Sequence, residues 1–488
     1  MSRLPLLRVS ASQVFNGSVP ESPKQLASIL PAAVLSQRHG NSVTATASRQ
    51  QRETRAMQRC LPDWYTYTPS RPVCSNPNHE YGLMDTLARL YPPLVEREPI
   101  PVTFIPATFA LTLLPFFFSK HRRQVALAIL PVLLSVSLLA PCYTFGDPSA
   151  DFYRSSAFII MPLWFIDFAV MRSEEGHDAP GYVGASRNGN QVPQRIEDCP
   201  TAWSKLCWAV TLMVPSHRGI GWNWQIKNIP LDPNLDLSKR DWIIRQAKSA
   251  VLAYLQSIAM LVMLGFTSSL QQTTRTLAMP FLNALIGWSG AIWIYSRLTC
   301  FYSTSSALTV ALGFYEIWQL PPLMGSVRDA WSVRQFWAMY HQTMRQMVSQ
   351  PALRITRMLG LQKGTRASAV SQLFIAFFVS CLVHQYQMFN VTRRDMGEFA
   401  FFMSQPVAIC FESGVMWLWH RHVKADDERI AALGRICGYA WVFLWFSITL
   451  PIYLKGSRDA GIVRDALVGN VPFEFGAHLA GFLVTGRM

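Results

Sequence analysis

The chain has 488 residues, of which half are hydrophobic and only 15% are charged. Soluble proteins carry about 25% charged residues, so this composition predicts that much of the surface faces lipid rather than water. The 44 Lys and Arg residues exceed the 29 Asp and Glu residues and give a net charge of +15. Because these basic residues lie mostly between apolar runs, without zinc-finger spacing, we expect no nucleic-acid partner.

Residues 1–59 are polar, rich in Ser, Arg and Gln, and poor in acids. This composition is typical of a disordered tail, and its Arg- and Ser-rich bias also resembles a mitochondrial transit peptide. We expect residues 60–99 to form a segment before the membrane and residues 100–488 to form a membrane domain. The first span is expected to direct insertion, and the endoplasmic reticulum is the expected location.

A series of apolar runs of bilayer length begins at residue 100. The runs are Ile100–Phe118, Gln124–Phe145, Phe152–Met171, Ser249–Thr267, Pro280–Ser296, Phe301–Trp318, Ala369–Met388, Phe399–Trp419 and Ile430–Tyr453. Two shorter runs, Trp203–Val214 and Phe475–Val484, are expected to span or to lie at the interface. The predicted fold is all-α, a multi-pass bundle of about eight to ten spanning helices, because unpaired backbone groups are too costly in lipid.

Two long connections, Ser216–Lys248 and Gly325–Ser368, are rich in Lys and Arg. Such segments are the strongest candidates for the cytosolic side. Three apolar runs separate them, which places them on opposite faces if all three cross the membrane. The run Phe301–Trp318 is rich in Ser and Thr and contains Glu316, so a re-entrant or half-crossing path for this run stays open.

Three segments carry polar and aromatic residues that suit a functional site. The first is HRGIGWNWQIKNIP, where two glycines beside two tryptophans indicate tight turns packed on aromatic rings. The second is SVRQFWAMYHQTMRQ, whose aromatic and basic residues suit a helix at the membrane surface. The third is His384, which follows an apolar stretch near the end of a span. An ionisable residue at membrane depth is costly and therefore a candidate for function, although a histidine bonded to a neighbouring helix is the simpler reading.

The three segments together resemble the wax-synthase-like branch of the membrane-bound O-acyltransferases. The order is RGIGWNW…P, then S-x-R-x-FW-x-x-x-H, then an apolar helix ending in His. The resemblance is closer still to a fungal subgroup that acetylates hydroxyls of terpenoid and meroterpenoid natural products. It covers roughly Pro215 to Tyr453 and extends to the number of spans.

The resemblance implies roles for individual residues. His384 matches the membrane-buried catalytic histidine, and His341 stands where the family has Asn or His after its FW motif. Ala338 and Met339 depart from the Gly-Arg that often follows FW, and Tyr340 replaces a usual Trp. The residues expected to contact substrate or cosubstrate are Arg218, Trp222, Asn223, Lys227, Asn228, Phe336, Trp337 and Gln342.

The chemistry of these residues agrees with an acyl-CoA-dependent O-acyltransferase. An alcohol needs a base to become a nucleophile, and a neutral imidazole suits that task. His341, Asn223 or Gln342 would supply donors to the oxyanion. Acyl-CoA, expected to be acetyl-CoA, would approach the basic segments as a cosubstrate, and a lipophilic alcohol would enter from the bilayer. No bound cofactor is expected, and the oligomeric state is left open.

Alternative functions stay open at this stage. A long-chain wax-ester or sterol-ester acyltransferase differs only in donor length, which the sequence does not reveal. A multi-span transporter would also use buried His384 and Glu316, but no internal repeat is visible. A lone pair, Asp147 and Asp151, lacks the partner motif of a prenyltransferase. The nine scattered cysteines contain no CxxC pair, so we predict neither a disulfide framework nor a metal site.

Overall fold

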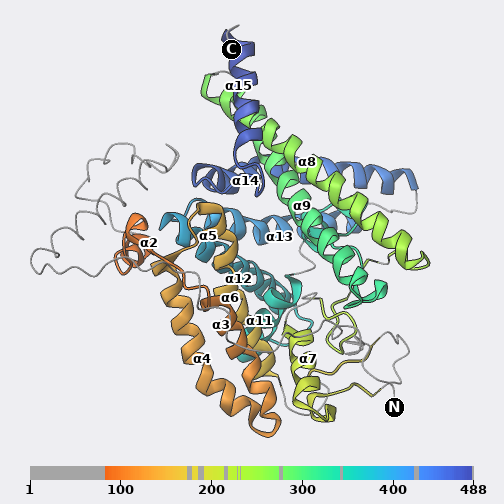
Figure 1. Cartoon of the computed structure of the whole chain (residues 1–488). Coiled ribbons are helices and arrows are strands. Elements are labelled where there is room, and N and C mark those ends of the chain that lie inside the picture. Colours follow the sequence, from red (N-terminus) through yellow and green to blue (C-terminus); the bar gives the residue numbers. More distant parts are fainter. Residues whose placement is uncertain are drawn as a thin grey trace, which may run out of the picture. The chain divides into compact units, whose positions relative to one another are not determined.

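The structure is a computed structural model that describes residues 83–488 apart from 173–177, 185–191, 214–217, 228, 231, 274–277, 341–343, 423–427 and 486–488. The predicted tail at residues 1–59 and most of the segment at residues 60–99 lie outside the described residues. The helices are α2 Leu83–Ala88, α3 Phe104–Leu113, α4 Arg122–Leu139, α5 Pro148–Ser155, α6 Ala157–Phe165, α7 Ala202–Met213, α8 Lys239–Thr273, α9 Met279–Ala311, α10 Val333–Tyr340, α11 Arg345–Met358, α12 Arg366–Thr392, α13 Glu398–His422, α14 Glu428–Asp459 and α15 Val471–Thr485 (Figure 1).

The predicted fold class, a multi-pass helical membrane bundle, is confirmed. Within the described ranges, six helical segments are long and apolar enough to cross a membrane. They are Arg122–Cys142, Pro148–Met171, Lys239–Gln272, Arg366–Thr392, Glu398–Trp419 and Glu428–Asp459. Two shorter apolar helices, Phe104–Phe117 and Val471–Val484, correspond to the first and last predicted runs. The strands β1 Glu98–Pro99 and β2 Tyr143–Thr144 form a parallel pair of two residues each.

Helix α9 corrects the prediction of two separate runs, Pro280–Ser296 and Phe301–Trp318. Both runs belong largely to one continuous helix of 33 residues. Arg297 interrupts the apolar pattern, but its guanidinium pairs with the fully buried carboxylate of Asp465 at 2.8 Å. A charge neutralised in this way does not end a helix at membrane depth.

The end of the second run also differs from the prediction. Helix α9 ends just before Gly313, whose φ of +78° is a conformation that glycine adopts readily. Glu316 is exposed in the turn that follows, where its carboxylate accepts a hydrogen bond from Trp318 Nε1. The run Phe301–Trp318 is therefore divided between the end of α9 and the turn after it, and Glu316 lies outside the helix.

This correction removes the difficulty over the two basic segments. Helices α8 and α9 are antiparallel neighbours, since Ser303 Oγ of α9 bonds Ser249 Oγ of α8 at 3.3 Å and Ser296 Oγ bonds Gln256 at 3.1 Å. The start of α8 and the end of α9 therefore lie together. The basic segment before α8 and the basic segment after α9 are consequently at the same end of this helix pair.

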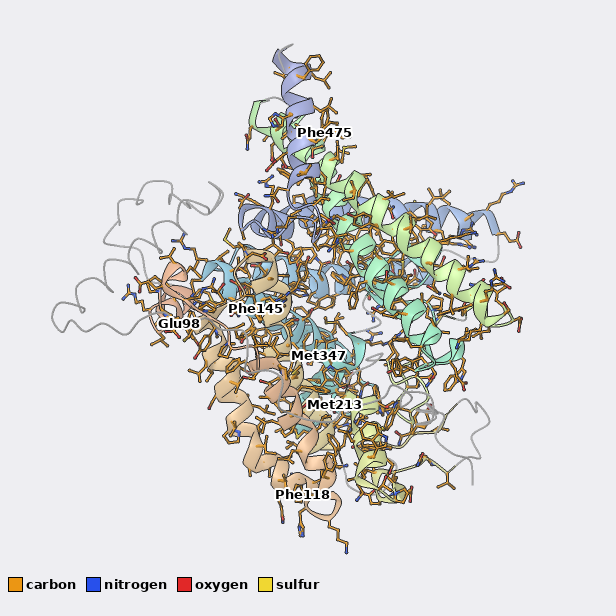
Figure 2. All side chains as sticks on the ribbon, in the orientation of Figure 1. Glu98, Phe118, Phe145, Met213, Met347 and Phe475 are labelled. Atoms are coloured by element: carbon orange, nitrogen blue, oxygen red, sulfur yellow. The ribbon has the colours of Figure 1, made fainter. Side chains whose placement is uncertain are left out.

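Helix α4 has contacts at both ends with the helices that carry the site. Figure 2 shows Phe118 beyond its N-terminal end and Phe145 beyond its C-terminal end. At the Phe118 end, Arg354 of α11 pairs with Asp167 at 3.1 Å and Arg122 donates to the carbonyl of Arg172 at 2.9 Å. We call this the basic end. The segment Gly325–Ser368, expected as a connection, contains the helices α10 and α11.

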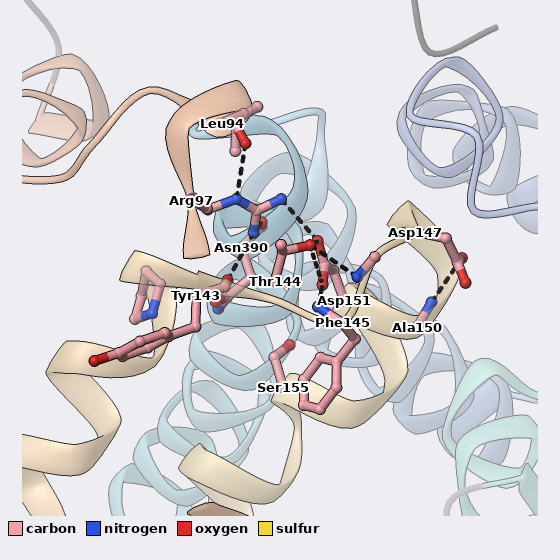
Figure 3. A network of polar contacts seen from close by, with 12 residues as sticks. Leu94, Arg97, Tyr143, Thr144, Phe145, Asp147, Ala150, Asp151, Ser155 and Asn390 are labelled. Carbon is pink, nitrogen blue, oxygen red and sulfur yellow. Dashed lines mark hydrogen bonds and ion pairs between the residues drawn. The ribbon is translucent and has the colours of Figure 1, made fainter. Parts of the chain in front are cut away.

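A polar network fixes the C-terminal end of α12 (Figure 3). The guanidinium of Arg97 pairs with Asp151 at 2.7 Å and donates to the Asn390 carbonyl of α12 at 2.9 Å. Asp151 also accepts from Thr144 and from the backbone N–H of Phe145. These bonds tie the β1–β2 pair and α5 to the last turn of α12.

Candidate functional site

Helix α12 holds His384 between the two larger core clusters. Val383 belongs to a cluster built from α3, α4, α6, α7 and α11, whereas Cys381 belongs to a cluster built from α10, α13 and α14. Figure 1 shows α12 among α5, α6, α11 and α13. The hydroxyl of Tyr386 donates to the Ser137 carbonyl at 2.6 Å. Together with the Arg97–Asn390 bond, this contact holds the half of the helix that carries His384.

Aromatic rings from two other helices enclose the imidazole of His384. The Phe402 ring of α13 stacks on it, with ring centroids 4.6 Å apart and planes 11° apart. The Tyr453 ring of α14 meets it edge-on at 5.9 Å, and the Tyr453 hydroxyl lies 3.4 Å from His384 Nδ1. His384 is half-buried. The imidazole therefore lies among aromatic rings, while the catalytic role of His384 stays a prediction.

Helix α10 carries the FW pair into the same aromatic cluster. The Phe336 ring lies 4.1 Å from the Phe446 ring, and Trp337 contacts Phe402 at 6.4 Å between centroids. Trp337 thus packs on the ring that stacks on His384. The segment was expected at the membrane surface. The structure packs its aromatic face against α12, α13 and α14, where Phe336 and Trp337 are half-buried.

Two polar residues of α13 make this placement possible, and the sequence analysis missed both. The fully buried carboxamide oxygen of Gln405 accepts hydrogen bonds from Trp337 Nε1 at 3.2 Å and from Trp445 Nε1 at 3.0 Å. The carboxylate of Glu412 accepts from the backbone N–H groups of Val333 and Arg334 at 2.8 and 2.9 Å. A carboxylate at a helix N-terminus satisfies donors that have no partner within the helix.

The RGIGWNW segment forms the predicted tight turns. Gly219 and Gly221 have φ of +67° and +78°. A Cβ added at Gly219 would lie 2.6 Å from the Trp224 ring, so no larger residue fits there without movement. Trp222 is buried, with its ring 5.0 Å from Trp208 and 5.4 Å from Tyr182. Burial raises the pKa of Tyr182 to about 12, against the opposing effect of its hydrogen bond with Gln319.

Arg218 is fully buried and binds groups of the chain itself. Its guanidinium donates to the carbonyls of Pro321 and Pro322 at 2.8 and 2.6 Å and to the Tyr302 hydroxyl at 2.8 Å. The two prolines precede α10. At the other side, Arg345, which begins α11, donates to the Lys227 carbonyl at 3.3 Å. The RGIGWNW segment and Lys227 after it therefore contact the chain both before and after α10. The role of this segment toward substrate stays a prediction.

Of the remaining predicted residues, two are described by the structure and three are not. Asn223 uses its side chain within the protein, donating to the Ala179 carbonyl at 2.7 Å and accepting from the Gly181 N–H at 3.1 Å. The Lys227 side chain is exposed. His341, Gln342 and Asn228 lie outside the described residues, so their predicted roles are untested.

The rival aspartate pair has a structural explanation. Asp147 caps α5 by accepting from the N–H groups of Ser149 and Ala150 at 2.9 and 3.0 Å, and Asp151 pairs with Arg97 (Figure 3). These bonds make both residues parts of the helix frame rather than ligands of a diphosphate-bound metal.

Comparisons with known proteins find a similar family and similar enzymes. The model of the membrane bound O-acyl transferase family matches residues 320–404, a range that contains the FW pair, His384 and Phe402. The acetyltransferase ple2 of Rhodocybe pseudopiperita is 26% identical over 333 residues, covering 66% of this chain and 82% of the relative. The acetyltransferase eriL of Hericium erinaceus is 28% identical over 360 residues, covering 71% of this chain and 88% of the relative.

A third relative has a different named activity. The O-mevalon transferase macI of Penicillium terrestre is 29% identical over 283 residues, covering 52% of this chain and 63% of the relative. The matched range includes the helices that hold His384 and the FW pair together, and the described helices include several membrane spans. Residues 320–404 are thus similar to the membrane bound O-acyl transferase family, and the chain is a multi-pass membrane O-acyltransferase.

Proposed function

We propose that the enzyme transfers an acetyl group from acetyl-CoA to a hydroxyl of a lipophilic small molecule, such as a terpenoid or meroterpenoid, with His384 as the general base. The observation that carries this proposal is the convergence of His384 and the FW helix on one aromatic cluster. Two relatives named acetyltransferases support the acetyl donor, although the third relative transfers a different group.

The proposed reaction has two proton transfers. His384 accepts the proton of the alcohol while the alcohol oxygen attacks the thioester carbonyl. The tetrahedral intermediate then collapses, the C–S bond breaks, and the imidazolium returns the proton to the leaving thiolate. The products are an ester and free coenzyme A. The aromatic rings around His384 exclude water, which would otherwise hydrolyse the thioester.

The charge distribution supports the direction from which the donor arrives. Coenzyme A is anionic, and Arg345 and exposed Lys227 lie together at the start of α11, with Arg354 further along the same helix. Positive potential raises the local concentration of an anionic cosubstrate. We propose that acyl-CoA binds from this side and that the alcohol enters from the bilayer. The endoplasmic reticulum membrane stays our proposed location.

The experiment that tests this function uses membranes from cells with and without the chain. Radiolabelled acetyl-CoA is offered with a panel of terpenoid alcohols, and labelled ester is counted. Transfer from acetyl-CoA that depends on the chain is the expected result. Palmitoyl-CoA in the same assay decides the donor, since preferred use of palmitoyl-CoA would favour the long-chain ester alternative and contradict the acetyl donor.

A further inference from the structure

We propose that Tyr453 is a positioning residue for His384. Its hydroxyl accepts the Nδ1 proton, so that Nε2 carries the lone pair that receives the proton of the alcohol. This inference rests on His384 as the base of the proposed function. Nothing in the sequence pattern singled out Tyr453, which lies 69 residues further along the chain in another helix.

The geometry fixes the imidazole in two ways at once. Phe402 stacks on the imidazole face with planes 11° apart, which restricts the tilt of the ring. The Tyr453 hydroxyl lies in hydrogen-bonding reach of Nδ1, at 3.4 Å, which opposes rotation of the ring about its side-chain bond. A histidine exposes one nitrogen as an acceptor only when the other nitrogen holds the proton. In the proposed direction the Tyr453 hydroxyl accepts the Nδ1 proton, and Nε2 is left as the base.

Tyr453 is itself held firmly. The residue is 9% exposed, and its ring stacks on Phe401 with centroids 5.1 Å apart. Its helix is pressed against α9, since a Cβ added at Gly290 would lie 2.4 Å from Leu454. A phenol with so little freedom keeps its hydroxyl at one place, which is the requirement for a group that orients a base.

Gln387 is a polar alternative to Tyr453. It lies three residues beyond His384 on the same helix, and its buried Oε1 has no hydrogen-bond partner within the described residues. A side chain on α12 moves with His384, however. Tyr453 belongs to α14 and therefore holds the imidazole in place relative to a separate helix. Tyr453 therefore fixes the imidazole relative to the FW cluster, in which Phe446 of α14 contacts Phe336.

The test is Tyr453→Phe, which keeps the ring and removes the hydroxyl. We expect kcat to fall about 10- to 100-fold because the base is misoriented, while KM for acyl-CoA and for the alcohol stays unchanged. Tyr254→Phe is the matched control. It also removes a tyrosine hydroxyl, but that hydroxyl bonds Asp465 and does not contact His384. An unchanged kcat in Tyr453→Phe, or a raised KM with unchanged kcat, would overturn the inference.

A double variant separates this inference from the proposed function. If Tyr453 acts through His384, adding Tyr453→Phe to His384→Ala causes no further loss of the residual transfer rate. A further loss of tenfold in the double variant would mean that Tyr453 acts on its own and would contradict the inference. Full activity in His384→Ala alone would instead overturn the catalytic role of His384, whatever Tyr453 does.

Discussion

At the scale of residues, the site depends on a few polar groups in aromatic surroundings. Trp337 illustrates this, because its ring contacts Phe402 while its indole N–H is satisfied by Gln405. An indole N–H buried without a partner costs free energy, which Gln405 prevents. The FW pair therefore supports the imidazole through Phe402, in addition to any contact with substrate.

Substitution of Trp337 should separate these two contributions. We expect Trp337→Phe to lower the free energy of unfolding by about 1 kcal/mol, the value of one lost hydrogen bond. Trp337→Ala should lower it by about 3 to 5 kcal/mol because it also leaves a cavity. Thermal unfolding of the purified protein in detergent measures both. Equal melting temperatures for the two variants would contradict the packing role.

His384 could be predicted from the sequence because a histidine in an apolar run is rare and costly. Gln405 and Glu412 also lie within an apolar run. The same rule would therefore have identified them as candidate functional residues. Tyr453 could not be found in this way, since tyrosine is common at span ends. Only the packing of α14 against α12 brings its hydroxyl to Nδ1.

At the scale of elements, α10 is unusual because its N-terminus is buried among spanning helices. Backbone N–H groups at the start of a helix need acceptors, and water is scarce there. Glu412 of α13 supplies both acceptor oxygens and also accepts from Trp441 Nε1. The carboxylate therefore allows the start of the FW helix to pack against α13.

Removal of this cap should loosen α10 more than other helices. We expect Glu412→Ala to destabilise the protein by about 1 to 2 kcal/mol, with cleavage near α10 in limited proteolysis. Glu474→Ala is the control, because Glu474 is an exposed first-turn acid of α15. The capping role fails if both variants show the same proteolytic pattern as the unmodified protein.

The element boundaries show where the sequence pattern was insufficient. The pattern broke α9 into two runs at Arg297, since a lone charge usually ends a span. The partner that removes this cost, Asp465, lies 168 residues away and could not be paired from the sequence. Most other spans were predicted because their apolar runs are long and bounded by charges.

At the scale of the whole molecule, small residues allow the spanning helices to approach closely. Gly265 of α8 and Gly476 of α15 face one another, and a Cβ added at either would lie 1.9 Å from a backbone oxygen of the other helix. Without a hydrophobic driving force between helices in lipid, such close contact is a main source of association. The α8–α15 crossing depends on it.

Two glycines of α15 provide a matched test of this crossing. Gly476→Ala should lower the melting temperature, because the helices must separate to admit the methyl group. Gly481→Ala should leave it unchanged or raise it, since a Cβ there meets nothing within 4 Å and alanine favours the helix. Equal shifts in the two variants would show that the crossing is not tightly packed.

The two basic segments should face the same side of the membrane. In a background without native cysteines, Lys239→Cys and Lys363→Cys should react with a membrane-impermeant maleimide from the same side. Val102→Cys, near the Phe145 end of α4, should react from the other side (Figure 2). Labelling of Lys239→Cys and Lys363→Cys from opposite sides would contradict the arrangement of α8 and α9.

In the proposed function, acyl transfer depends on His384 as the base. The most direct measurement is the rate of acyl transfer by His384→Ala in membranes, compared with His478→Ala, an exposed histidine of α15. Loss of general-base catalysis predicts a fall of about 100-fold or more in His384→Ala, with His478→Ala retaining the full rate. Equal rates for His384→Ala and the unmodified enzyme would contradict the role of His384 as the base.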